Sequence, residues 1–86
     1  MKNGSANDPS LTYTIVSHRY GNLAFTGSSF KKVVSAIKVY CMYFNVDISA
    51  HRFFYKGKWI DADDTPCSLY MNNGDVVNVY KDGAQI

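Results

Sequence analysis

The sequence predicts a single α+β domain in which one long helix lies across a mixed β-sheet. The chain has 86 residues, which suits one small domain, and 47% of them are hydrophobic, which excludes a wholly disordered chain. Segments of alternating apolar and polar residues, typical of strands, flank one segment whose apolar residues recur at steps of three and four. The predicted order is strand, strand, helix, strand, strand, short helix, strand.

The N-terminal part is expected to contain a flexible leader and a β-hairpin. Residues 1–10 are polar and rich in loop-forming types. Residues 11–16 alternate between the two side-chain classes, as in a half-buried strand. Gly21 and Asn22 predict a hairpin turn, and residues 23–26 form a second, shorter strand.

An amphipathic helix of about four turns is expected next, from the spacing of its apolar residues. The segment Gly27-Ser28-Ser29 offers a hydroxyl that can cap the N-terminus of the helix, and Asn45 can adopt the left-handed conformation that ends it. The apolar residues that define its buried face are Phe30, Val33, Val34, Ile37, Tyr40, Cys41 and Phe44.

The C-terminal half supplies the remaining strands of the sheet. Its expected elements are a strand at 51–55, a turn at 56–57, a brief strand at 59–60, a short helix at 66–69, a tight turn at 72–75 and a last strand at 76–80. The residues expected to be largely buried are Ile15, Phe25, Val33, Ile37, Tyr40, Phe53, Ile60, Leu69, Val77 and Val79.

Composition and spacing argue against several function classes. The net charge of +2 is too mild to indicate nucleic acid or an anionic membrane as a partner, and no apolar run approaches the ~18 residues that span a bilayer. Cys41 and Cys67 lack metal-binding spacing, and His18 and His51 have no nucleophile in a catalytic motif, so we expect no metal, no cofactor and no enzymatic activity. Two free thiols indicate a reducing, intracellular compartment.

The C-terminal half also carries a family resemblance. Residues 52–60 (RFFYKGKWI), Thr65-Pro66, Leu69, Met71 and residues 75–80 (DVVNVY) fall in an ungapped series that resembles SUMO and SUMO-like domains. The resemblance covers residues 11–82. It implies a β-grasp, ubiquitin-like fold, a role in the SUMO pathway in the nucleus or cytoplasm, and binding of other proteins without catalysis.

The end of the sequence departs from that family. SUMO proteins mature to a terminal diglycine, whereas the tail at 83–86 ends in Gln85 and Ile86, and a β-branched Ile is stiffer and wider than glycine. We therefore expect a SUMO-like domain that acts non-covalently. The alternative is a divergent protein modifier whose diglycine is absent from this sequence, and a nucleic-acid-binding β-grasp domain is a third class, although no basic and aromatic motif points to it.

The resemblance implies a peptide-binding groove between the second strand and the helix, where SUMO-interacting motifs add a strand to the sheet. The matching positions are Leu23, Phe25, Gly27, Lys32, Val33, Ala36, Tyr40 and Tyr43. Small residues at 27 and 36 and non-basic residues at 28, 35 and 43 predict weak binding of ordinary motifs. The alternative is that these residues only complete the core.

A second surface follows from the same resemblance, because the family docks on the SUMO-conjugating enzyme there. Its expected residues are Lys56, Gly57, Asp63, Asp64 and Asp75, with Asp61 nearby. Lys56 opposes this assignment, since the family usually has an acid before the glycine. The alternative is a solvated loop.

Overall fold

The computed structural model describes residues 10–81, so the predicted leader, apart from Ser10, and the predicted tail lie outside the described residues. Ser10 itself begins the first strand. The elements are β1 (Ser10–Val16), β2 (Leu23–Ser28), α1 (Val33–Phe44), the 3-10 helix η2 (Ile48–Ala50), β3 (His51–Tyr55), β4 (Lys58–Trp59) and β5 (Asp75–Lys81).

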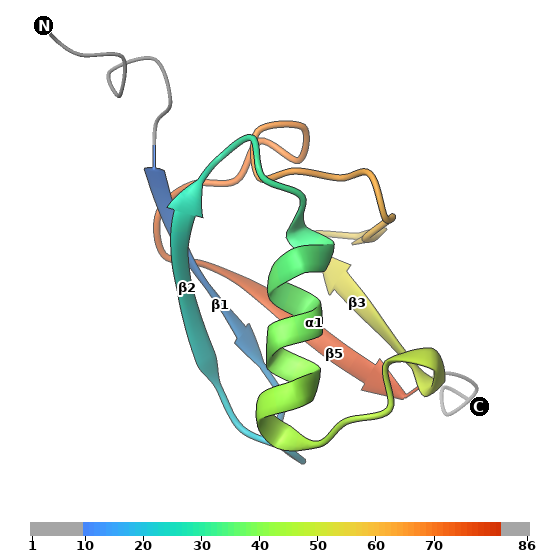
Figure 1. The fold of residues 1–86 in the computed structure, drawn as a ribbon. Helices are drawn as coiled ribbons and strands as arrows, with labels where there is room; N and C mark the ends of the chain where they lie inside the picture. Colours follow the sequence, from blue (N-terminus) through green and yellow to red (C-terminus); the bar gives the residue numbers. More distant parts are fainter. Residues whose placement is uncertain (1–9, 82–86) are drawn as a thin grey trace, which may run out of the picture.

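The strands form one mixed sheet in the order β2-β1-β5-β3-β4. β1 and β5 are parallel neighbours, whereas the β1–β2, β3–β5 and β3–β4 pairs are antiparallel. Helix α1 covers one face of this sheet, as Figure 1 shows. The predicted α+β class, with one long helix across a mixed sheet, is confirmed.

The core lies between α1 and the covered face of the sheet. Ile15, Val33, Tyr40 and Val77 are fully buried, and the Tyr40 hydroxyl donates a hydrogen bond to the Gly21 carbonyl oxygen at 2.6 Å. Six of the ten predicted core residues are buried: Ile15, Val33, Ile37, Tyr40, Phe53 and Val77. The other four, Phe25, Ile60, Leu69 and Val79, pack against this core and are half-buried.

The helix begins three residues later than its hydrophobic spacing predicts, and its predicted serine cap is absent. Lys32 occupies the N-cap position without a side-chain hydrogen bond, and Phe30 is 56% exposed. The residues before the helix form a turn instead, in which the Phe30 N–H donates to Ser28 Oγ at 3.0 Å. The first helical N–H, that of Val33, donates to the Asp64 carbonyl oxygen at 2.9 Å. The predicted left-handed cap at Asn45 is confirmed, with φ 57°.

The short helix predicted at 66–69 is a series of hydrogen-bonded turns. The Leu69 and Met71 N–H groups donate to the carbonyl oxygens of Thr65 and Pro66, but Ser68 and Thr65 also exchange side-chain hydrogen bonds with each other's backbone. Such local bonds compete with regular helix. A short helix occurs elsewhere, at η2, where the Asp47 side chain accepts the Ser49 N–H.

The β3–β4 hairpin closes through the turn predicted at Lys56 and Gly57. Both residues have positive φ, 44° and 86°, as a tight two-residue turn requires. The register pairs Tyr55 with Lys58, so β4 begins one residue earlier than expected. The Ile60 N–H still donates to the Phe53 carbonyl oxygen at 2.8 Å, which continues the ladder.

Candidate functional site

Strand β2 lies at the edge of the sheet, beside the N-terminal half of α1. It pairs with β1 along one side, and within residues 10–81 no other strand pairs with it. An edge strand presents backbone donors and acceptors that can pair with another chain. Side chains at Leu23 and Phe25 are half-buried on the helix side of this strand, whereas Ala24 and Thr26 are exposed.

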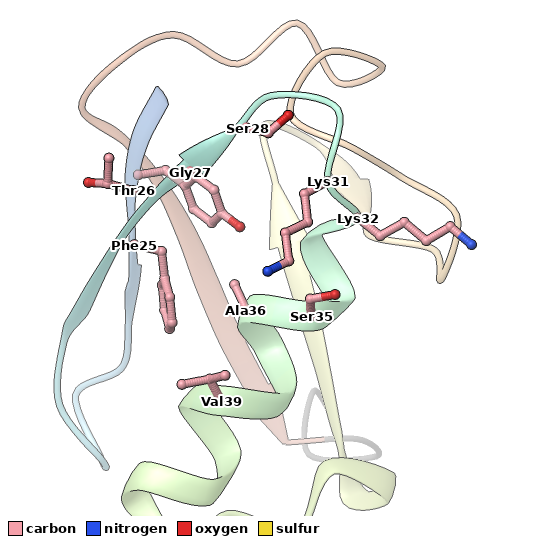
Figure 2. Close-up of a pocket in the computed structure, with 10 residues that line it drawn as sticks. Phe25, Thr26, Gly27, Ser28, Lys31, Lys32, Ser35, Ala36 and Val39 are labelled. Atoms are coloured by element: carbon pink, nitrogen blue, oxygen red, sulfur yellow. The ribbon is translucent and has the colours of Figure 1, made fainter. Parts of the chain in front are cut away.

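A groove of about 130 Å³ lies between β2 and α1. Figure 2 shows Phe25 and Ala36 facing each other across it, with Lys31 reaching along the groove toward Ala36. The Tyr13 ring packs next to that of Phe25, with their centroids 6.1 Å apart. The full lining consists of Tyr13, Phe25, Thr26, Gly27, Ser28, Lys31, Lys32, Ser35, Ala36 and Val39. The groove therefore combines an aromatic and aliphatic floor with a cationic rim at one end.

The structure brings together only some of the residues expected in this groove. Phe25, Gly27, Lys32 and Ala36 line it, whereas Tyr40 is fully buried in the core. Val33 is fully buried and belongs to the core, so its side chain is not available to a partner in this conformation. Leu23 packs against the core outside the lining, and Tyr43 lies further along the helix with its ring 4.8 Å from that of Phe44.

Lys31 is one of the groove residues that the sequence pattern does not reveal, together with Tyr13, Thr26 and Val39. The helix begins at Val33, so Lys31 belongs to the turn that enters it rather than to a helix face. Locating the first residue of the helix would have placed Lys31 in the groove, because the side-chain direction of a residue before the first turn is set by the loop and not by the helical periodicity. Among the described residues Lys31 has no salt bridge, whereas the Lys32 amine lies 3.3 Å from the Asp63 carboxylate.

Gly27, next to the last residue of β2, leaves the groove open at the C-terminal end of this strand. A Cβ atom built at this position would meet no other atom within 4 Å, so the space is unoccupied by the protein's own side chains. The backbone here is an ordinary strand rather than a conformation that requires glycine. A side chain from a bound peptide could therefore fill this position.

The expected acidic surface contains carboxylates that the fold already uses. Asp64 Oδ2 accepts hydrogen bonds from the Lys58 amine at 2.7 Å and from the Asp61 N–H at 2.8 Å. The Lys58 hydrogen bond is the main reason that the pKa of Asp64 lies below its ordinary value. Because the Asp64 carbonyl also accepts the first N–H of α1, this residue holds the loop against the helix.

Asp75 has a comparable structural role beside the Lys56–Gly57 turn. Its Oδ2 accepts hydrogen bonds from the Asn72 N–H at 2.9 Å and from the Tyr55 hydroxyl, and its side chain is only 18% exposed. The Asn72 N–H, followed by the Tyr55 hydroxyl, lowers the pKa of Asp75. Burial, together with the neighbouring Asp75, raises the pKa of Tyr55 to about 12.

Each carboxylate of this surface has a lysine neighbour. Lys56 lies 3.8 Å from Asp75, and Lys58 also lies 3.4 Å from Asp61. Asp63 is the most accessible acid, with 92% of its side chain exposed. The charges of this surface are therefore mutually compensated. Of the five residues expected to form it, Lys56, Gly57 and Asp63 are exposed, as is the neighbouring Asp61.

Other chemistry-bearing residues take structural positions. The His51 ring lies between the Tyr20 hydroxyl, 2.9 Å from Nε2, and the Asp47 carbonyl oxygen, 2.7 Å from Nδ1. Cys41 is buried and Cys67 is exposed, and neither forms a disulfide. In residues 10–81 no group of three or more His, Cys, Asp or Glu residues could hold a metal ion. Over the same part of the chain, no helix is both long and apolar enough to cross a membrane.

Comparisons with sequences return nothing: no family model matches the chain, and no curated protein matches it. Comparisons of structure do return similar folds. A solved structure described as "Molecular Mimicry of SUMO promotes DNA repair" is 24% identical, with a TM-score of 0.69, over 83% of this chain and 90% of that one.

Two further similar structures are an archaeal ubiquitin and a protein designed from ubiquitin. The ubiquitin of Caldiarchaeum subterraneum is 18% identical, with a TM-score of 0.75, over 91% of this chain and all of that one. A de novo design based on ubiquitin is 13% identical, with a TM-score of 0.73, over 87% of this chain and 92% of that one. The chain has the ubiquitin-like β-grasp fold.

Proposed function

We propose that this chain is a SUMO-like interaction domain that binds other proteins non-covalently, with the β2–α1 groove as its peptide site. The observation that carries the proposal is the edge strand β2 beside a groove with an apolar floor and a lysine at its rim. The sequence resemblance to SUMO points the same way. The description of one structurally similar protein speaks of molecular mimicry of SUMO.

The binding mode that this geometry favours is strand addition. An extended peptide pairs its backbone with the outer edge of β2, and alternate apolar side chains lie on Phe25, Ala36 and Val39. Main-chain hydrogen bonds then supply affinity, and the groove selects side chains. Lys31 changes the expectation of weak binding, because it supplies positive charge to a rim where residues 28 and 35 are serines.

Titration of the domain with a peptide that has a central run of β-branched residues and an acidic flank tests this proposal. We expect micromolar binding that disappears when the central peptide residues are replaced by prolines, which cannot donate to the ladder. Phe25→Ala should weaken the binding. Thr14→Ala changes a β1 residue that alternates with the buried Tyr13 and Ile15, so its side chain is on the face of the sheet away from the helix and the change should leave the binding unaltered. Equal affinity for the proline peptide would contradict strand addition.

A second candidate partner is the SUMO-conjugating enzyme, docked on the surface around Lys56, Gly57 and Asp63. Its support is the exposed hairpin turn and the exposed Asp63 carboxylate, together with the sequence resemblance in residues 52–80. Calorimetry with the purified enzyme tests it, comparing the native chain with Lys56→Glu and Asp63→Lys. We expect Lys56→Glu to strengthen binding and Asp63→Lys to weaken it, and undetectable binding in all three would exclude this surface.

A reducing compartment, either nucleus or cytoplasm, suits this function because Cys67 is exposed and unpaired by any disulfide. Expression as a fluorescent fusion and a count of oxidised thiols would test the assignment. Secretion with an oxidised Cys67 would contradict it.

A further inference from the structure

The outer face of α1 is apolar at the positions where a solvated helix normally carries polar side chains. Val39 is 51% exposed, Met42 is 82% exposed and Tyr43 is 69% exposed. These three residues are spaced by three and four positions, so they lie on one side of the helix and form a continuous stripe. We call Val39, Met42 and Tyr43 the helix stripe.

The helix stripe continues the β2–α1 groove. Val39 belongs to both, because it lines the groove and begins the stripe. Strand β2 and helix α1 run in opposite directions (Figure 1), and in Figure 2 Lys31 lies at one end of the groove and Val39 at the other. The combined surface therefore has two chemically different ends, one cationic and one apolar.

We propose that the helix stripe is the second half of the peptide site, which accepts large apolar side chains at one end of the ligand while Lys31 receives acidic side chains at the other. This inference rests on the proposed function, because it assigns the ligand chemistry of the same groove. Val39 and Tyr43 are separated by about 6 Å along the helix axis, which equals roughly two residues of extended chain. The ligand is therefore a strand-forming apolar segment with an acidic flank and a short apolar extension.

Met42 suits a contact with the apolar extension of the ligand, because its flexible side chain adapts to different apolar partners.

Charge complementarity favours a peptide partner over a second copy of this chain. Lys31 has no salt bridge within residues 10–81, so its amine is available to a ligand carboxylate. A second copy that offered its own helix stripe would supply no such group, since residues 33–44 contain no acid. The acid that follows this segment, Asp47, already binds Ser49 through its carboxylate.

Fluorescence anisotropy with matched peptides tests the inference on the intact chain. The test peptide has three Asp residues, a Val-Ile-Val-Ile centre and a terminal Leu-Trp pair, and the control peptide has Ser-Ser in place of Leu-Trp. Each is made in both chain directions, because strand addition can be parallel or antiparallel. We expect Leu-Trp to tighten binding about tenfold in one direction, from the apolar area that it buries.

The variant Met42→Ser with Tyr43→Ser should remove that tenfold gain and leave the affinity for the Ser-Ser peptide unchanged. Lys38→Ser, a neighbouring exposed position outside the stripe, should preserve the gain. Binding of both peptides with no effect of Leu-Trp or of the double variant would overturn this inference alone, and failure of every peptide to bind would overturn the proposed function with it. Sedimentation analysis that detects a dimer abolished by the double variant would assign the stripe to self-association and overturn the peptide proposal.

Discussion

The β2–α1 groove and the surface around Lys56 and Asp75 differ in what their charged side chains already do. In the groove, Lys31 extends over an open floor and has no salt bridge in the part of the chain that the structure describes. On the other surface, Asp64 and Asp75 are mostly buried and accept hydrogen bonds from the protein itself. Charged residues of the same domain thus divide between those available to a partner and those that stabilise the fold.

This difference separates stability from binding. Removing a buried carboxylate leaves its donors without a partner and lowers the free energy of unfolding. Removing an exposed, unengaged lysine changes little in the folded chain but removes an electrostatic contact with a ligand. Variants on the peptide groove should therefore lose binding, whereas variants at Asp64 and Asp75 should lose stability.

The largest effect is expected beneath the groove, at Val33. Val33→Asp places a carboxylate without a partner in a fully buried position and should lower the unfolding free energy by about 4 kcal/mol or more, which unfolds a domain of this size. Val39→Asp is the matched control on the same helix, where half of the side chain is exposed, and should retain the native melting curve. Urea denaturation followed by circular dichroism measures both. Equal stability of the two variants would mean that the core is assigned incorrectly.

The next effect is expected at Asp75. Asp75→Ala deprives the Tyr55 hydroxyl and the Asn72 N–H of their acceptor and should lower the unfolding free energy by about 1–3 kcal/mol. Asp63→Ala removes a carboxylate that is 92% exposed and should change stability by less than about 0.5 kcal/mol. Thermal unfolding of the two variants gives the comparison. If Asp75→Ala is as stable as the native chain, the fold does not need this carboxylate, and Asp75 would be available to bind a partner.

Acid should weaken the fold through the same carboxylates. The pKa values of Asp64 and Asp75 are lowered in the folded chain, so their stabilisation is fully present above the unfolded pKa of about 3.9 and is lost as the pH falls through their folded pKa values. The unfolding free energy should therefore decline below about pH 4. In Asp75→Ala the decline should be shallower, because one of the linked carboxylates is absent. A pH series of urea denaturation curves that has the same slope in both proteins would contradict this linkage.

The smallest effect on the fold and a clear effect on binding are expected at Lys31. Lys31→Glu should lower the affinity of the domain for a peptide with an acidic flank by about three- to tenfold, while the unfolding free energy stays the same. Lys38→Glu reverses an equivalent exposed charge on the helix but outside the groove, and should leave the affinity nearly unchanged. Peptide titration at two salt concentrations checks both variants. Identical losses in the two would indicate a general charge effect rather than a contact at the rim.

The sequence predicted the fold well because its signals are local. Alternation in residues 11–16 and helical spacing between Val33 and Phe44 each depend on a few neighbouring residues, and the structure has both elements. The start of α1 depends instead on a hydrogen bond between Val33 and Asp64, which lie far apart in the sequence. No local pattern reveals such a contact, and the placement of Lys31 in the groove follows from it.

The candidate sites were predicted only in part for the same reason. Phe25 and Ala36 reach the groove as expected, because strand alternation and helix periodicity fix the directions of their side chains. The engagement of Asp75 depends on Tyr55, twenty residues away, and that of Asp64 depends on Lys58 across a loop. Sequence reasoning identified these acids as surface charge, but their partners are set by the packing of the whole domain.

Mapping of peptide contacts on the isotope-labelled domain by NMR tests the central claim most directly. The ligand is the acidic-flanked Val-Ile-Val-Ile peptide, titrated while the backbone amide shifts are followed. We expect the largest shifts at residues 23–39, on β2 and the first half of α1, and no shifts at Lys56, Gly57 and Asp75. Shifts confined to Lys56, Gly57 and Asp75, or no shifts at saturating peptide, would contradict the account.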